Sequence, residues 1–124
     1  MSSSRDRSDR TRIRDAADAS EHVWTFLSNF AHVLVCIAQD PDLTLREIAE
    51  RVGITERATH RLVAELESAG VITRERTGRR NHYEIDLTAP MRHPLEADKT
   101  VGDLLSALLG KKEAASLRRR SRAS

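Results

Sequence analysis

Residues 45–87 read LREIAERVGITERATHRLVAELESAGVITRERTGRRNHYEIDL, and this stretch decides the fold. Just before it, Thr44 stands three residues ahead of Glu47, which is the capping-box pattern of a helix N-terminus. Gly53 suits the left-handed conformation that ends a helix, and Thr55 is a good cap for the next helix. The pattern predicts two short helices joined by a Gly-Ile-Thr turn.

Apolar residues recur in both segments at spacings of three and four, as in amphipathic helices. The apolar face of the first helix is expected to consist of Leu45, Ile48, Ala49 and Val52. The inner face of the second is expected to consist of Ala58, Leu62, Leu66 and Ala69, before Gly70 ends it. Each helix is therefore expected to bury one side in the core and to expose the other.

A β-hairpin is predicted next in the chain. Residues 71–76 and 82–87 alternate in the manner of strands, and residues 77–81 between them are of turn-forming types. Tyr83 and Ile85 are expected to share one face with Leu87. The order of elements predicts a mainly α fold with a small β-hairpin, which is the arrangement of a winged helix-turn-helix.

Flanking helices are predicted on both sides of this core. Residues 23–38 contain no Gly or Pro and carry two apolar stripes, so this helix should be buried on two sides. Pro90 and Pro94 mark an extended linker, after which Thr100 caps a last short helix.

The length of 124 residues suits one domain, which we place at residues 20–110. Residues 1–19 are rich in Ser, Arg and Asp and are predicted to be a disordered tail, and residues 111–124 to be a basic disordered tail. The longest apolar run has six residues, so no membrane contact is expected. A single cysteine suits a reducing compartment, and we expect a cytoplasmic protein.

The net charge of +2 conceals a pattern along the chain. Residues 53–82 hold six basic and four acidic residues, and residues 111–124 hold six basic residues and one acidic residue. The segments that flank residues 53–82 are acidic on balance. Basic charge is thus concentrated where the helix pair and the hairpin are predicted, which favours a nucleic-acid partner. The chain has only four aromatic residues, too few to stack a run of unpaired bases.

The quoted stretch resembles the DNA-binding core of MarR-like and ArsR-like bacterial winged-helix transcriptional regulators. The resemblance is carried by the turn AERVGIT at residues 49–55 and by LESAGVI at residues 66–72. It implies that the helix after Thr55 enters the major groove, that the hairpin, or wing, reaches the backbone or minor groove, and that flanking helices form a dimer.

Helical geometry, taken by itself, also indicates which side of the second helix would face DNA. At 100° per residue, Arg57, His60 and Ala64 lie opposite Leu62, with Glu56 and Arg61 beside them. Arginine can read guanine and glutamate can accept from cytosine, while threonine suits phosphate. The residues predicted to contact double-stranded DNA are Thr55, Glu56, Arg57, Thr59, His60, Arg61, Arg74, Arg76, Arg79 and Arg80.

Two other interpretations of these residues stay open. In the first, the arginines simply form a solvated surface, as most charge runs do. In the second, the fold serves as a protein-interaction adaptor whose second helix binds a partner protein.

A homodimer is predicted because two apolar surfaces lack a partner, namely the second stripe of the first helix and the last short helix. The predicted interface consists of Trp24, Leu27, Leu34, Val101, Leu104, Leu105 and Leu108. The alternative is that the last helix folds back on the first within a monomer.

No catalytic or metal site is predicted. The five glycines are isolated, and no phosphate-binding loop, paired carboxylates or nucleophile motif occurs. The chain is therefore not expected to be an enzyme or to hold a cofactor. His32 and Cys36 are one helical turn apart on a polar stripe, but two ligands do not make a metal site. We expect that stripe to line a dimer contact or a crevice for a small-molecule effector, with Cys36 a buried thiol rather than a redox sensor.

Overall fold

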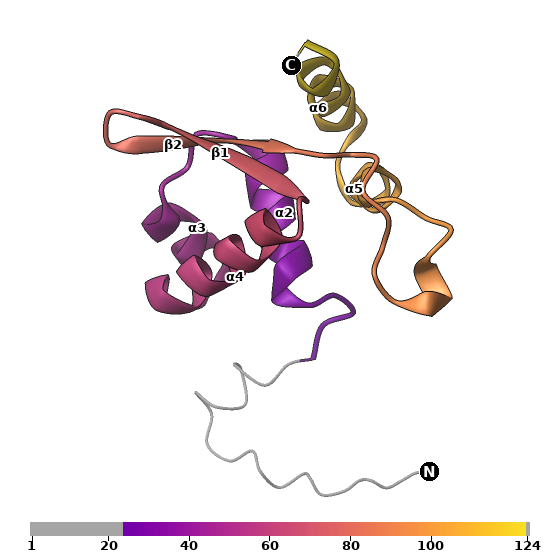
Figure 1. Cartoon of the computed structure of the whole chain (residues 1–124), viewed down its shortest axis with the longest axis horizontal. Helices are drawn as coiled ribbons and strands as arrows, with labels where there is room; N and C mark the ends of the chain where they lie inside the picture. Colours follow the sequence, from indigo (N-terminus) through magenta and orange to yellow (C-terminus); the bar gives the residue numbers. More distant parts are fainter. Residues whose placement is uncertain (1–23, 124) are drawn as a thin grey trace, which may run out of the picture.

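The structure, a computed structural model, describes residues 24–123 (Figure 1). This part of the chain forms five α-helices, one 3-10 helix and a two-stranded antiparallel hairpin. The predicted tail at residues 1–19 lies outside the described residues, as does the start of the predicted domain.

Helix α2 (Asn29–Gln39) runs through the centre of the fold. The apolar stripes predict a helix from residue 23, but residues 24–28 are not helical. The helix begins after Ser28, whose extended backbone forms the N-cap without a side-chain hydrogen bond. The rings of Trp24 and Phe26 instead contact each other edge to face with centroids 4.8 Å apart, and these residues are 73% and 91% exposed.

Helices α3 (Leu45–Val52) and α4 (Glu56–Ser68) confirm the predicted helix pair. Thr44 and Glu47 form the capping box, since the Glu47 N–H donates to Thr44 Oγ1 and the Thr44 N–H donates to Glu47 Oε1. Gly53 ends α3 in the left-handed conformation, with φ of 88°. The turn between the two helices is therefore fixed by local side-chain and backbone chemistry.

The buried side of α4 is rotated from the predicted one. Ala58 is half-buried and Ala69 is exposed, whereas the buried residues are Thr59, Leu62, Val63 and Leu66. At 100° per residue, the centre of this arc lies about 50° from Leu62. The shift has a simple cause, because burying Val63 removes more apolar surface from water than burying an alanine does.

Strands β1 (Ile72–Thr77) and β2 (Arg80–Ile85) form the predicted hairpin with Ile72 opposite Ile85. The strands reach further than expected, so the turn has two residues rather than five. Gly78 takes its first position with φ of 63°, which glycine adopts at little cost. Tyr83 and Ile85 are buried on one face.

The 3-10 helix η3 (Pro94–Glu96) and helix α5 (Val101–Leu108) follow the wing. Thr100 caps α5 as predicted, and Asp103 completes a capping box. The N–H of Gly102 donates to the Leu87 carbonyl at 2.9 Å, which joins α5 to the end of the hairpin segment. The contact is close, because a Cβ on Gly102 would lie 2.8 Å from that oxygen.

Residues 111–123 correct the prediction of a disordered tail, because they form helix α6 (Lys111–Ala123). Ala114 and Leu117 of α6 are buried. Arg120 Nη2 donates to the Ala38 carbonyl at 2.7 Å, so α6 is bonded to the end of α2. The single large apolar residue in this segment, Leu117, would not order the helix by itself. It packs against a core formed by residues far away in the sequence.

The core surrounds α2. The parts of both predicted stripes that lie in α2 are mostly buried, with Val33 and Ile37 on one and Leu34 and Ala38 on the other. Helices α3 and α4 and strand β2 contact α2, and α5 and α6 contact it as well. The prediction that this helix is buried on two sides is confirmed, but elements of the same chain cover both.

Candidate nucleic-acid interface

The outward side of α4 carries charged side chains that the core does not use. Glu56, Arg57, His60 and Arg61 are all exposed, as their predicted role requires. The rotation of the buried arc places Arg57 and Arg61 near the middle of this side and Glu56 nearer to its edge. Within residues 24–123, the side chains of Arg57 and His60 have no hydrogen bond or ion pair, so their donors are free for a ligand.

Arg61 differs because it already has a partner on the same helix. Its Nη1 lies 3.1 Å from Glu65 Oε2, and both side chains are more than half exposed. Exposed pairs at this helical spacing contribute only about 0.3–0.5 kcal/mol. A phosphate or a base edge can therefore displace Glu65 at little cost.

The two threonines of the predicted site have different environments. Thr59 is 0% exposed, and its hydroxyl donates to the Thr55 carbonyl at 3.0 Å. The predicted phosphate contact of Thr59 is therefore wrong, because its hydroxyl is enclosed and already bonded. Thr55 is exposed, and its Oγ1 accepts from the Ala58 N–H, which leaves the hydroxyl hydrogen for an acceptor outside the protein.

The arginines of the wing are held to different degrees. Arg79 is exposed at the tip, and its side chain has no partner in the described part of the chain. Arg76 is also exposed and its Nε donates to the Gly78 carbonyl at 3.3 Å. Arg74 is less free, because its Nη2 lies 3.4 Å from Glu67 Oε1 of α4.

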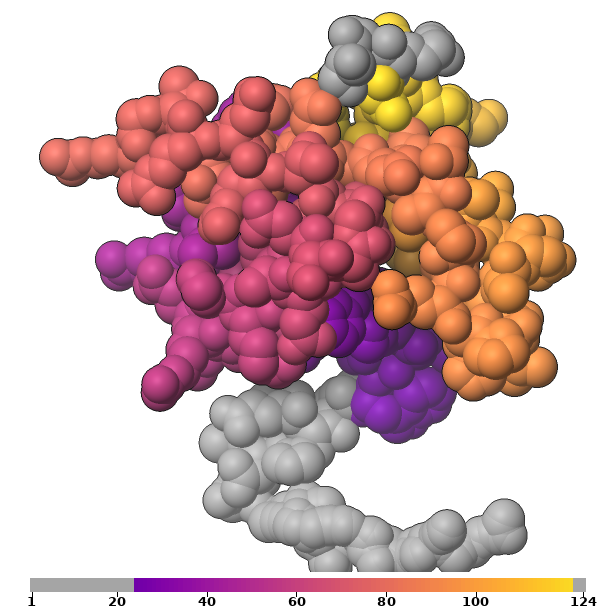
Figure 2. Space-filling model, in the orientation of Figure 1, coloured from indigo at the N-terminus to yellow at the C-terminus, as the bar shows by residue number. Residues whose placement is uncertain are grey.

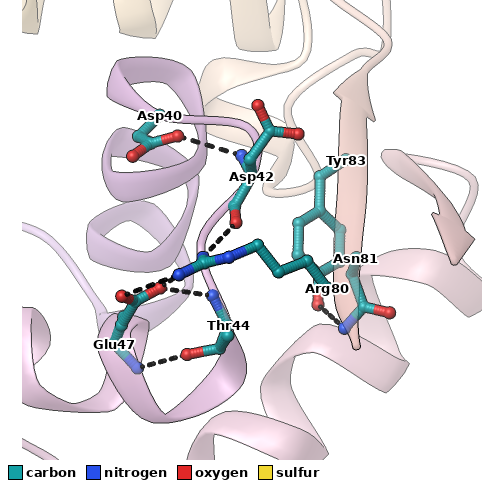
Figure 3. A network of polar contacts seen from close by, with 7 residues as sticks. All are labelled: Asp40, Asp42, Thr44, Glu47, Arg80, Asn81 and Tyr83. Carbon is teal, nitrogen blue, oxygen red and sulfur yellow. Dashed lines mark hydrogen bonds and ion pairs between the residues drawn. The ribbon is translucent and has the colours of Figure 1, made fainter. Parts of the chain in front are cut away.

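Arg80 is turned inward toward α3 rather than outward (Figure 3). Its Nη1 donates to the Asp42 carbonyl at 2.8 Å and to Glu47 Oε1 at 2.9 Å. Close by, His82 Nδ1 lies 2.7 Å from Asp42 Oδ1. These bonds tie the tip end of the wing, next to the Gly78–Arg79 turn, to the start of α3, and a phosphate would have to compete with them for the half-exposed guanidinium of Arg80.

The carboxylate of Glu47 is the centre of this network. It accepts from Arg80 and from the Thr44 N–H, which together lower the pKa of Glu47 from its ordinary value of 4.5 to about 2. Glu47 therefore stays ionised throughout the neutral and mildly acidic range. A residue predicted only as part of a helix cap also positions the wing.

The predicted dimer residues divide into two groups. Leu34, Val101 and Leu105 are buried in the core of the single chain, so they offer no exposed surface and that part of the prediction is corrected. The reason is that α5 packs against α2 of its own chain, which was the alternative considered from the sequence. Leu27 and Leu104 are half-buried, and Trp24 and Leu108 are exposed.

A groove of about 540 Å³ follows the polar stripe of α2. Its lining consists of Leu27, His32, Val35, Cys36, Gln39, Arg51, Val52 and Leu108. Burial raises the pKa of the Cys36 thiol, and the charge of Arg51 opposes this only in part. Among residues 24–123, no three His, Cys, Asp or Glu side chains gather as a metal site would need.

Sequence reasoning missed the acceptors of Arg80, because nothing local links residue 80 to residues 42 and 47. It also missed α6 as an ordered basic helix, although the arginines of this segment are evident in the sequence.

Comparison with known proteins supports the helix-turn-helix. Residues 32–73 match a family model described as winged helix-turn-helix DNA-binding. This part of the chain is similar to winged helix-turn-helix DNA-binding domains. No curated protein matches the chain significantly. Among solved structures, the winged helix is similar to a mutant of MepR from a multidrug-resistant S. aureus clinical isolate, with 16% identity, a TM-score of 0.41, and coverage of 77% of this chain and 75% of that one.

The match to the family model ends within β1, so the rest of the wing and helices α5 and α6 lie beyond it. No described helix is long and apolar enough to cross a membrane.

Proposed function

We propose that this protein is a transcriptional regulator that binds specific sequences of double-stranded DNA as a homodimer. Helix α4 lies in the major groove, and the wing contacts the backbone or the minor groove. The protein works in the cytoplasm, associated with the nucleoid when bound to DNA, and has no enzymatic activity of its own.

The observation that carries the proposal is the pair Arg57 and Arg61 at the middle of the outward side of α4. The opposite side of the helix is anchored by buried residues, so the arginines project from a rigid support. The major groove admits an α-helix, and arginine can donate two hydrogen bonds to the O6 and N7 atoms of guanine. Arg57 is the better candidate because it has no competing partner within residues 24–123.

The wing gives the sequence-independent part of binding. Arg76 and Arg79 present cations at and near the tip, while the bonds of Arg80 to α3 keep the tip end of the hairpin in place. A fixed wing costs less entropy on binding than a mobile one. Arg79 is therefore the residue that we assign to phosphate or to the minor groove.

The dimer is proposed through the surface that the fold leaves exposed, not through the buried leucines. Trp24 and Phe26 are large apolar side chains with most of their surface in solvent, and Leu108 is 43% exposed at the rim of the groove along α2. A second copy of the chain that covers this groove would bury Leu108, and one that also reached the segment before α2 would bury Trp24 and Phe26. A two-fold dimer would also bring two α4 helices to neighbouring half-sites about 10 bp apart.

The groove cannot serve a dimer contact and an effector at once, so we assign it to the second copy. A small-molecule effector stays an expectation from the sequence, and no described feature selects its chemistry.

The competing function is a protein-interaction adaptor, in which α4 binds a partner protein. Salt dependence of duplex binding separates the two functions. We expect wild-type protein to bind mixed-sequence duplex DNA tightly at about 50 mM salt and to lose affinity steeply by about 200 mM, because neutralised phosphates release counterions. No measurable duplex binding at the lower concentration would overturn the regulator proposal.

A further inference from the structure

We propose that the outward face of α6 binds a second segment of duplex DNA, separate from the segment held by α4 and the wing. The inference rests on the proposed function, because it takes duplex DNA as the ligand of the protein. It names a further binding surface that lies outside the winged helix-turn-helix.

Helix α6 is docked firmly enough to present its charges in a fixed direction. Its inner side packs on α2 and α5, with Ala114 and Leu117 buried. Arg120 donates to the Ala38 carbonyl in the last turn of α2 at 2.7 Å. A chain end held in this way loses less entropy on binding than a disordered tail would.

The opposite side of α6 gathers positive charge. The helix has six basic residues and one acidic residue, and Lys111, Lys112, Arg118 and Arg119 are exposed. Lys112 and Arg119 are two turns apart, about 10 Å along the axis, and lie almost opposite the buried side. Lys112 and Arg119 therefore form one row on the surface of α6.

The lysines at the start of α6 do not serve the stability of the helix. Lys111 and Lys112 occupy the first turn, where the helix dipole disfavours cations. Clustered like charges on one helix are also unfavourable. A polyanion laid along the face would remove both costs, and duplex DNA carries about one negative charge per 1.7 Å of its axis.

The position of α6 requires a separate segment of DNA. Figure 1 places α6 and α4 on opposite sides of the β1–β2 hairpin, and α6 lies at one edge of the molecule in Figure 2. The outward face of α6 points away from α2 and thus away from the winged helix. One straight duplex in contact with α4 would not reach it.

A membrane surface is the main competing polyanion, and the packing of α6 disfavours it. Interfacial helices bury an apolar face among lipids. The large apolar residue of α6, Leu117, is already buried in the protein, so the exposed face has none to insert.

The test counts duplexes bound per chain with a short mixed-sequence DNA of about 15 bp, which is roughly one and a half turns of the double helix. Sedimentation at low salt is expected to show one more bound duplex per chain for the wild-type protein than for the Lys112→Gln/Arg119→Gln variant. This additional duplex is the further duplex. The control variant Arg92→Gln/Lys99→Gln removes the same charge from the exposed linker and should behave as wild type. The further duplex should dissociate from the wild-type protein as the salt concentration rises, because its binding releases counterions from the phosphates.

Three results would overturn the proposal: equal duplex numbers for wild type and the α6 variant, an equal loss in the linker control, or binding to phosphatidylserine vesicles without a further duplex. A wrong proposed function would give a different result. The tight binding class that depends on Arg57 would be missing as well. If that class is present while the further duplex is not, the proposed function stands and only the inference about α6 is overturned.

Discussion

Arg80 of the wing and Glu47 of α3 form an ion pair with Nη1 and Oε1 2.9 Å apart, although 33 residues separate them in the chain. The same guanidinium also donates to the Asp42 carbonyl (Figure 3). The pair joins the tip end of the wing to the first turn of α3, and α3 packs on α4, so the wing and α4 of the proposed interface hold a fixed relation to each other.

The first prediction concerns the pH dependence of stability. The pKa of Glu47 is about 2 in the folded protein and 4.5 ordinarily. A lowered folded-state pKa stabilises the protein above the ordinary value, and this contribution is lost as the pH falls from about 4.5 toward 2. Glu47→Gln should therefore flatten the fall in the unfolding free energy across this window, as measured by urea denaturation.

The matched control is Glu50→Gln on the same helix, whose partner Arg46 is highly exposed and 3.6 Å away. Glu50→Gln should change the pH dependence of the unfolding free energy less than Glu47→Gln does. Identical profiles for wild type and Glu47→Gln would show that the pair with Arg80 does not contribute to folding.

Local patterns predicted the centre of the fold. Thr44, Glu47, Gly53 and Thr55 act on residues within one helical turn, so their capping roles follow from spacing alone. The exposure of Arg57 followed from helical periodicity in the same way. Propensity and periodicity are sufficient where the interactions are local.

Long-range contacts account for what the sequence did not reveal. Arg120 and the Ala38 carbonyl are 82 residues apart, and α6 is ordered because this bond and Leu117 attach it to the core. Thr59 has a polar side chain, but the rotation of α4 toward Val63 encloses it. These outcomes depend on how the elements pack together, which periodicity does not determine.

The second prediction concerns the docking of α5. Gly102→Ala should destabilise the protein by about 1–3 kcal/mol, because the new Cβ would lie 2.8 Å from the Leu87 carbonyl oxygen and the backbone would have to move. Gly110→Ala is the control, since a Cβ there meets nothing within 4 Å. Thermal unfolding should separate the variants, and equal melting temperatures would contradict this packing of α5.

The third prediction concerns the oligomeric state. Leu108→Glu places a charge on the exposed rim of the groove and should yield a folded monomer from the proposed dimer. Leu105→Glu should instead unfold the chain, because Leu105 is 0% exposed within a single copy. Sedimentation and circular dichroism measure the two effects. A wild-type monomer, or an unchanged dimer in Leu108→Glu, would argue against this interface.

The fourth prediction concerns Cys36. Burial raises the pKa of its thiol, so little thiolate forms near neutral pH and a thiolate-selective reagent should react with it slowly. Denaturant should restore the reactivity of an ordinary cysteine. Rapid labelling of the native protein would contradict the interpretation of Cys36 as a structural thiol.

The most direct test of the central claim is the effect of Arg57→Ala on binding to the preferred duplex, selected from random sequences. We predict a loss of about 1–3 kcal/mol on that duplex and relaxed preference at one base-pair position. Arg92→Ala, an exposed arginine of the linker, serves as the control and should have little effect. Equal affinities and base preferences for wild type and Arg57→Ala would show that α4 does not read DNA in the way proposed here.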